Sequence, residues 1–178
     1  MNFKKDHQSK LVKQIFKLRG KNNIITRKDI LKAQEAWGNA IVKIGKLKAD
    51  RESYEKITDK LLDKLYAFKN GEILFKPTRA AAIQFRTNKE GAMSYFIGGN
   101  DNFPEDKGFA LQPWTNIRFE NAAILFERNI AAAMGNYYFI DINNREMKVE
   151  YTFGYIKNKE GELKINLHHS SIPFNPST

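Results

Sequence analysis

The stretch that decides the fold runs from Met147 to Lys157, MKVEYTFGYIK, and resumes after a polar break in Leu163–Ser171, LKINLHHSS. Both segments alternate in side-chain character with a period of two, which is typical of strands that bury one face. The break, Asn158–Gly161, has the composition of a hairpin turn, so the two strands are predicted to pair antiparallel. The predicted faces carry Met147, Val149, Tyr151, Phe153 and Tyr155 in the first strand, and Leu163, Ile165, Leu167, His169 and Ser171 in the second.

Further strand-like segments precede this pair and extend it to a long antiparallel meander. Asn143-Asn144-Arg145 is a second hairpin-turn signal. Gly135 and Gly154 interrupt strands, which predicts that the sheet bends sharply at these two positions. The additional predicted strands are Ile73–Phe75, Ala82–Arg86, Ala92–Ile97, Thr115–Glu127 and Ile130–Ile142.

Helical patterns come before the sheet. Thr26-Arg27-Lys28-Asp29 resembles a capping box, and it precedes an apolar stripe at helical spacing. A second stripe follows the polar stretch Asp50–Glu55, and a short helix is predicted over residues 8–19. The stripes consist of Ala33, Trp37, Ile41 and Ile44, then Ile57, Leu61 and Leu65.

Helices followed by a meander indicate an α+β fold, in which the helices cover the apolar face of the sheet. A bent sheet wrapped over helices forms a cone with an interior pocket, and pockets of this kind often bind small molecules. We expect a basic N-terminal arm over residues 1–25 and a single barrel domain over residues 26–178.

The chain has 178 residues and a net charge of +10. Residues 1–70 hold 18 basic and 8 acidic side chains, so they carry the whole excess. A nucleic-acid-binding, acidic-partner or membrane-surface arm would have this charge, but so would the solvated faces of Lys-rich helices. We favour the solvated faces, because no RNA-reading motif accompanies the charge, and therefore expect neither a nucleic-acid nor a membrane partner.

No apolar run approaches 18 residues, and no secretory signal is apparent, so we expect a cytoplasmic protein.

The composition limits metal chemistry. The sequence has no Cys and only three His residues, His7, His168 and His169. A catalytic zinc site of the three-His type needs all three on one ion, but adjacent residues on a strand point to opposite faces. No EF-hand or P-loop pattern is present. A carboxylate-rich Mg²⁺ or Ca²⁺ site stays open as an alternative, but we expect neither a metal site nor a cofactor.

Several side chains could support other chemistry. If the face of Leu163 and Ile165 lines the pocket, His169 would stand beside the Ser171 hydroxyl as a general base or proton shuttle. A buried His bonded to a neighbour would give the same pattern. Thr78 places a hydroxyl directly after Pro77, which ends a strand, and would equally be a turn cap. Tyr95 sits in an apolar strand, where a phenol usually finds a partner, and would equally be a core Tyr.

Seven segments together resemble the iota-class carbonic anhydrases, densely over residues 71–174. The segments are Leu74-Phe75-Lys76-Pro77-Thr78, Phe85-Arg86, Ala92-Met93-Ser94-Tyr95-Phe96-Ile97-Gly98-Gly99, Glu105-Asp106-Lys107-Gly108-Phe109-Ala110, Ala133-Met134-Gly135-Asn136-Tyr137, Val149-Glu150-Tyr151-Thr152-Phe153-Gly154-Tyr155 and Leu167-His168-His169-Ser170-Ser171-Ile172-Pro173.

The resemblance implies a cone-shaped barrel related to the calcium/calmodulin-dependent kinase II association domain and to SnoaL-like isomerases. It also implies a homodimer and metal-independent, reversible hydration of CO2 to bicarbonate. Pocket hydroxyls would hold the substrate. Carried over to this chain, the catalytic residues are Thr78, Tyr95 and, from strand alternation, Ser171 with His169; the substrate-binding residues are Ser170, His168 and Arg86.

Some alternatives stay open at this point. Arg86 would either steer the anion or pair with an acidic side chain. The same fold could form a non-catalytic association or ligand-binding module. A SnoaL-like isomerase is a further possibility, but it needs a carboxylate in the pocket, and Glu150 is predicted to point away from the Val149 face.

Overall fold

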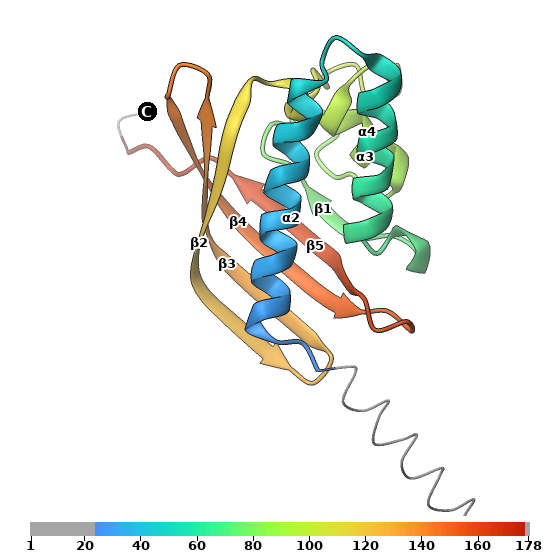
Figure 1. Cartoon of the computed structure of the whole chain (residues 1–178), viewed down its shortest axis with the longest axis vertical. Helices are drawn as coiled ribbons and strands as arrows, with labels where there is room; N and C mark the ends of the chain where they lie inside the picture. Colours follow the sequence, from blue (N-terminus) through green and yellow to red (C-terminus); the bar gives the residue numbers. More distant parts are fainter. Residues whose placement is uncertain (1–23, 177–178) are drawn as a thin grey trace, which may run out of the picture.

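The computed structural model describes residues 24–176 (Figure 1). The predicted helix over residues 8–19 lies outside them, as does all but the end of the predicted basic arm. Three helices and a five-stranded sheet make up the described chain, which confirms the α+β class. In chain order the elements are α2 (Arg27–Lys46), α3 (Arg51–Leu65), the 3-10 turn η1 (Phe68–Asn70), β1 (Leu74–Lys76), α4 (Lys89–Ile97), the 3-10 turn η2 (Phe109–Leu111), β2 (Trp114–Glu127), β3 (Ile130–Asp141), β4 (Glu146–Lys157) and β5 (Leu163–Ser171).

The sheet has the strand order β1-β5-β4-β3-β2. Strands β2 to β5 form the predicted antiparallel meander. Strand β1 runs parallel to β5, so the sheet is mixed rather than wholly antiparallel. The sheet stays open, with β1 and β2 at its edges, and α2 lies across one face of the bent strands (Figure 1).

The predicted capping box at the start of α2 is confirmed. The Thr26 hydroxyl accepts from the Asp29 N–H at 3.2 Å, and the Asp29 carboxylate accepts from the Thr26 N–H at 2.9 Å. This pairing satisfies donors that the first turn of a helix would otherwise leave free. It fixes the point at which the chain starts to cross the sheet.

Two predicted strands are wrong. Ala92–Ile97 belongs to helix α4, which starts where the Asn88 side chain accepts from the Gly91 N–H at 2.8 Å. A short apolar run that is buried all round has no periodicity that separates a strand from a helix. Ala82–Arg86 forms a loop. Its first two N–H groups, Ala82 and Ile83, donate to the Glu105 side chain instead of a neighbouring strand, as does that of the preceding Ala81.

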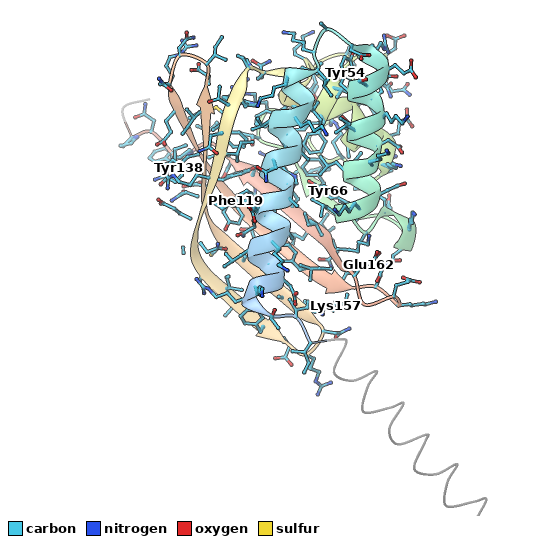
Figure 2. All side chains as sticks on the ribbon, in the orientation of Figure 1. Tyr54, Tyr66, Phe119, Tyr138, Lys157 and Glu162 are labelled. Carbon is cyan, nitrogen blue, oxygen red and sulfur yellow. The ribbon has the colours of Figure 1, made fainter. Side chains whose placement is uncertain are left out.

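The core lies between α2 and the sheet, with α3 and α4 closing its open side (Figure 1). Trp37 of α2 is its centre. The indole meets the rings of Phe96, Phe119, Tyr137, Phe139, Phe153 and His168 at centroid distances of 5.7–6.3 Å. One side chain thereby joins α4 and four strands, and Figure 2 shows Phe119 beside α2.

Both predicted bends of the sheet coincide with β-bulges. The β2–β3 register shifts between Asn121 and Ala123, opposite Gly135. A Cβ atom at Gly135 would collide with the Glu120 carbonyl oxygen. The β4–β5 register shifts between Gly154 and Tyr155, where Asn166 becomes the extra residue of β5. Bulges of this kind bend a strand and re-aim the side chains that follow.

We expect Gly135→Ala to destabilise the protein, because backbone must move to accommodate the new methyl group. The expected loss in free energy of unfolding is about 2 kcal/mol or more, equivalent to a fall in Tm of about 4–8 °C for a chain of this size. Thermal unfolding followed by circular dichroism measures it. Met134→Ala, at an exposed neighbour on the same strand, is the control. Equal melting temperatures for Gly135→Ala and the wild type would contradict the account of the bend.

Candidate active site

The bulge at Asn166 decides which side chains of β5 face the interior. Ile165 is buried, and after the extra residue His168 and Ser170 are buried as well. His169 is exposed and Ser171 is half-buried on the outer face. The expectation that His169 and Ser171 share the inner face with Ile165 is therefore wrong, because the bulge inverts the alternation of the strand.

A chain of buried hydrogen bonds crosses the interior from α2 to β3. Trp37 Nε1–H donates to Tyr66 Oη at 2.9 Å, and Tyr66 Oη lies 2.8 Å from His168 Nδ1. His168 Nε2 lies 3.0 Å from Ser170 Oγ, which in turn bonds Tyr137 Oη. Tyr66 follows the last turn of α3 and sits close to α2 (Figure 2). Helix α2, strands β3 and β5, and the residue that follows α3 thus supply one continuous polar chain.

The hydroxyls of Thr78 and Tyr95 lie near the Tyr137 end of this hydrogen-bond chain. Burial raises the pKa of both Tyr95 and Tyr137 well above its usual value. The Arg79 backbone and then the Thr78 side chain oppose that effect at Tyr95, and the Ser170 and Thr78 side chains oppose it at Tyr137. The Tyr95 hydroxyl has no hydrogen-bond partner within residues 24–176. Because a buried donor without a partner costs free energy, this hydroxyl is suited to an acceptor brought by a ligand.

Aromatic rings wall this hydroxyl cluster. His168 stacks on Phe75 at a centroid distance of 4.6 Å and meets Phe153 edge-on at 4.2 Å. Tyr95 stacks on Phe109 at 5.4 Å. An apolar wall with a few convergent donors is suited to a small apolar molecule that acquires negative charge.

A cavity of about 250 Å³ leads from Tyr95 to the surface. Arg79 and Lys107 line it and place two cations at its mouth. The carboxylates of Glu105 and Asp106 line the cavity too, but both pair with Arg86, so Arg79 and Lys107 are the charges that attract an anion. The remaining residues that line the cavity are Phe109 and Gln112.

The profile of the metal-independent carbonic anhydrase family matches residues 28–172. The chain belongs to this family. It is 40% identical to the metal-independent carbonic anhydrase of Nostoc sp. strain PCC 7120 over an alignment of 156 residues. The alignment covers 86% of this chain and 76% of the Nostoc protein.

Two solved structures extend the comparison. A cyanobacterial iota-carbonic anhydrase crystallised with bicarbonate aligns with a TM-score of 0.83 and 39% identity, over 86% of this chain and 95% of that one. A putative calcium/calmodulin-dependent protein kinase II association domain from Xanthomonas campestris aligns with a TM-score of 0.52 and 23% identity, over 81% and 84%. The second likeness concerns the fold alone, and it agrees with the expected relation to the kinase association domain.

In this member of the family, Arg86 pairs with acidic side chains. Its Nη2 lies 3.0 Å from Asp106 and 3.3 Å from Glu105. Three N–H groups of the Ala81–Ile83 loop, together with Arg86, lower the pKa of Glu105 to about 2. Ser94 also donates to Asp106, at 2.7 Å. Of the two predicted alternatives for Arg86, the structure has the ion pair, which ties two loops to α4.

The outer-face residues form a separate, shallow cavity of about 390 Å³. His169 and Ser171 line it, and Ser171 donates to Glu150 at 3.0 Å. Glu150 is exposed there, as predicted, and points away from the interior. The sheet separates this cavity from the hydroxyl cluster.

Sequence reasoning missed four side chains of the interior site. The sequence pattern indicates ordinary core aromatics at Tyr66 and Tyr137. It indicates ordinary surface charges at Arg79 and Lys107. The segment Ala133–Tyr137 belonged to the family resemblance, so Tyr137 had a signal that residue type alone did not convey. Lys107 had the same kind of signal, because it belongs to the segment Glu105–Ala110 of the resemblance. Tyr66 and Arg79 have none, because distant elements bring them to the site.

Among residues 24–176, no three His, Asp or Glu side chains gather in a way that could hold a metal ion. Over the same residues, no helix combines the length and the apolar character that a membrane crossing requires.

We expect His168 to make stability depend on pH. Burial holds the pKa of His168 well below 6.5, with a smaller effect from His169 in the same direction. Below pH 6.5 the unfolded chain therefore binds a proton that the folded chain does not. The free energy of unfolding should fall as the pH drops from 6.5 to 5, by up to about 1.4 kcal/mol per pH unit, and stay level above about pH 7.5.

Urea unfolding at a series of pH values measures this dependence. His168→Gln should flatten the curve between pH 5 and 6.5, and His169→Gln should leave it nearly as steep as in the wild type. Parallel curves for the wild type and His168→Gln would show that the buried imidazole is not the group responsible.

Proposed function

We propose that this protein catalyses the reversible hydration of CO2 to bicarbonate at the hydroxyl cluster of Thr78, Tyr95, Tyr137 and Ser170, which the cavity of about 250 Å³ reaches at Tyr95. The observation that carries the proposal is the convergence of four hydroxyls on an aromatic wall in a member of this family, one of them, that of Tyr95, without a partner in the described chain. The bicarbonate bound to the cyanobacterial relative supports the same ligand here.

The apolar wall would hold CO2, while the hydroxyls orient a water molecule about 3 Å from the carbon atom. As the water attacks, negative charge develops on the oxygens of the nascent bicarbonate. Hydrogen bonds from Tyr95 and from the Ser170–Tyr137 pair would stabilise that charge. Because burial raises the pKa of both phenols, they keep their protons and act as donors rather than as bases.

The reaction releases one proton for each bicarbonate formed. Buried His168 is a poor acceptor, because its pKa is lowered, and exposed His169 lies across the sheet. We therefore assign proton release to solvent at the cavity mouth. Arg79 and Lys107 at the same mouth would attract the product anion and hold it near the exit.

The competing functions find less support in the site. A SnoaL-like isomerase needs a carboxylate base in the pocket. Within residues 24–176, the carboxylates nearest the hydroxyls are Glu105 and Asp106 at the mouth, and both pair with Arg86. An association module would need no polar chain in its interior, and the orphaned Tyr95 hydroxyl would only reduce its stability.

We also propose that the protein works as a cytoplasmic homodimer that pairs through the outer face of the sheet. An apolar row crosses this face from edge to edge, since its members pair in register across all five strands. The end residues, Leu125 and Leu74, are 72% and 67% exposed. The row consists of Leu125, Ala132, Gly154, Leu167 and Leu74. Exposed apolar rows of this kind mark association surfaces.

We expect CO2 hydration well above the uncatalysed rate after exhaustive chelation. Tyr95→Phe and Ser170→Ala should each reduce kcat/KM by about tenfold or more, because each removes a donor to the developing charge. Ser171→Ala should stay within about twofold of the wild type. Stopped-flow hydration assays on metal-stripped protein measure all four.

Ser171→Ala is the matched control, since it removes the same hydroxyl one residue away on the opposite face of β5. Activity that disappears on chelation and returns with a metal ion would contradict the proposed reaction. A larger loss in Ser171→Ala than in Ser170→Ala would place the site on the outer face.

We expect sedimentation equilibrium to give twice the mass of one chain for the wild type and a shift to monomer for Leu125→Glu. The substitution puts a charge into the apolar row without touching the core. Leu31→Glu, at an exposed apolar residue of α2, should remain dimeric. A wild-type monomer at every concentration, or dissociation by Leu31→Glu alone, would rule out the proposed interface.

A further inference from the structure

We propose that Trp37 and Tyr66 are positioning residues that fix the direction of the buried hydrogen-bond chain, so that it ends in a free hydroxyl proton at the proposed substrate site. They do so by holding His168 in the tautomer with its proton on Nε2. The functional consequence rests on the proposed carbonic anhydrase site. The tautomer itself follows from the geometry of the chain.

The direction starts at Trp37, because an indole N–H can only donate. Tyr66 Oη accepts that bond, and the Tyr66 proton is left for its other neighbour, His168 Nδ1, at 2.8 Å. Nδ1 must then be the unprotonated nitrogen. In a neutral imidazole the proton therefore sits on Nε2, from which it is donated to Ser170 Oγ at 3.0 Å.

Counting protons locates the free end. The five side chains of the chain have one N–H or O–H donor each, and four hydrogen bonds join them. One proton is therefore left over. Because His168 already donates to Ser170, the surplus belongs to the Ser170–Tyr137 pair, whichever of the two donates to the other. That pair lies near Thr78 and near Tyr95, and Tyr95 lines the cavity that opens to the surface.

Solvent cannot rearrange this chain, because Trp37, Tyr66, Tyr137, His168 and Ser170 are each at most 2% exposed. The His168 ring is also clamped between Phe75 and Phe153. In this arrangement each of the four bonds has one donor and one acceptor, and only the proton at the ligand end is left over, so the other arrangements are disfavoured.

The opposite direction would cost stability and present the wrong group to substrate. With its proton on Nδ1, His168 would donate to Tyr66, which already accepts from Trp37, and the Tyr66 proton would have no acceptor. Ser170 would donate to His168 Nε2, and Tyr137 to Ser170. The cavity end would then offer lone pairs, which repel the oxygens of bicarbonate, instead of a proton that binds them.

The test combines nitrogen NMR with kinetics. Protein labelled with 15N in its histidines should show His168 with a protonated Nε2 and an unprotonated Nδ1, the assignment resting on single His→Gln variants of the three histidines. In Tyr66→Phe, where Nδ1 loses its donor, we expect a second population with the proton on Nδ1. We also expect kcat to fall by about tenfold, with KM for CO2 within about threefold.

Tyr155→Phe is the matched control. Its phenol is fully buried, and its hydroxyl has no partner among the described residues. Removing it should leave the His168 resonances unchanged and kcat within about twofold. The comparison separates loss of a buried hydroxyl in general from loss of the one that sets the direction.

Several results would overturn the inference. They are a wild-type His168 with its proton on Nδ1, a Tyr66→Phe variant with wild-type kcat, or a fall in kcat in Tyr66→Phe with unchanged His168 resonances, since the last would make Tyr66 merely structural. The expected tautomer in a protein without CO2 hydration would instead refute the proposed function and leave the direction of the chain intact.

Discussion

Trp37 makes the contact on which the rest of the interior depends. Its indole packs against rings from α4 and from four strands, and its only polar atom donates to Tyr66. Apolar packing of this kind brings α2 onto the bent sheet and removes water from the space between them. In a dry interior each polar group needs a partner. The donor on Trp37 therefore determines how the hydroxyls and the imidazole beyond it are arranged.

The two β-bulges convert this packing into a site. The one opposite Gly135 bends the sheet around α2, and the one at Asn166 turns His168 and Ser170 toward Trp37. Without the second bulge, simple alternation would place His169 and Ser171 inside. The site then consists of neutral donors on an aromatic wall. Such donors can stabilise an anion that forms there. Arg79 and Lys107 line the cavity at its mouth and attract the anion.

Much of the fold follows from local pattern. The long strands, the Thr26 capping box and the stripe through Trp37 could be predicted, because periodicity and capping act within a few residues. Helix α4 could not be predicted, since its apolar run is buried on nearly all sides. The orientation of β5 could not be predicted either, because one extra residue reverses the face of every residue after it, and the composition does not show which residue that is. Thr78 and Tyr95 came from the family resemblance; residue type alone left each open between site and packing.

The central claim is that neutral hydroxyls, not an ion, bind the substrate, and a crystal structure of this protein soaked in bicarbonate tests it most directly. The account predicts an anion in the interior cavity, with oxygens within hydrogen-bond distance of Tyr95 Oη and of the Ser170–Tyr137 pair. An anion bound instead beside His169 and Ser171 on the outer face, or held by a metal ion in the cavity, would contradict it.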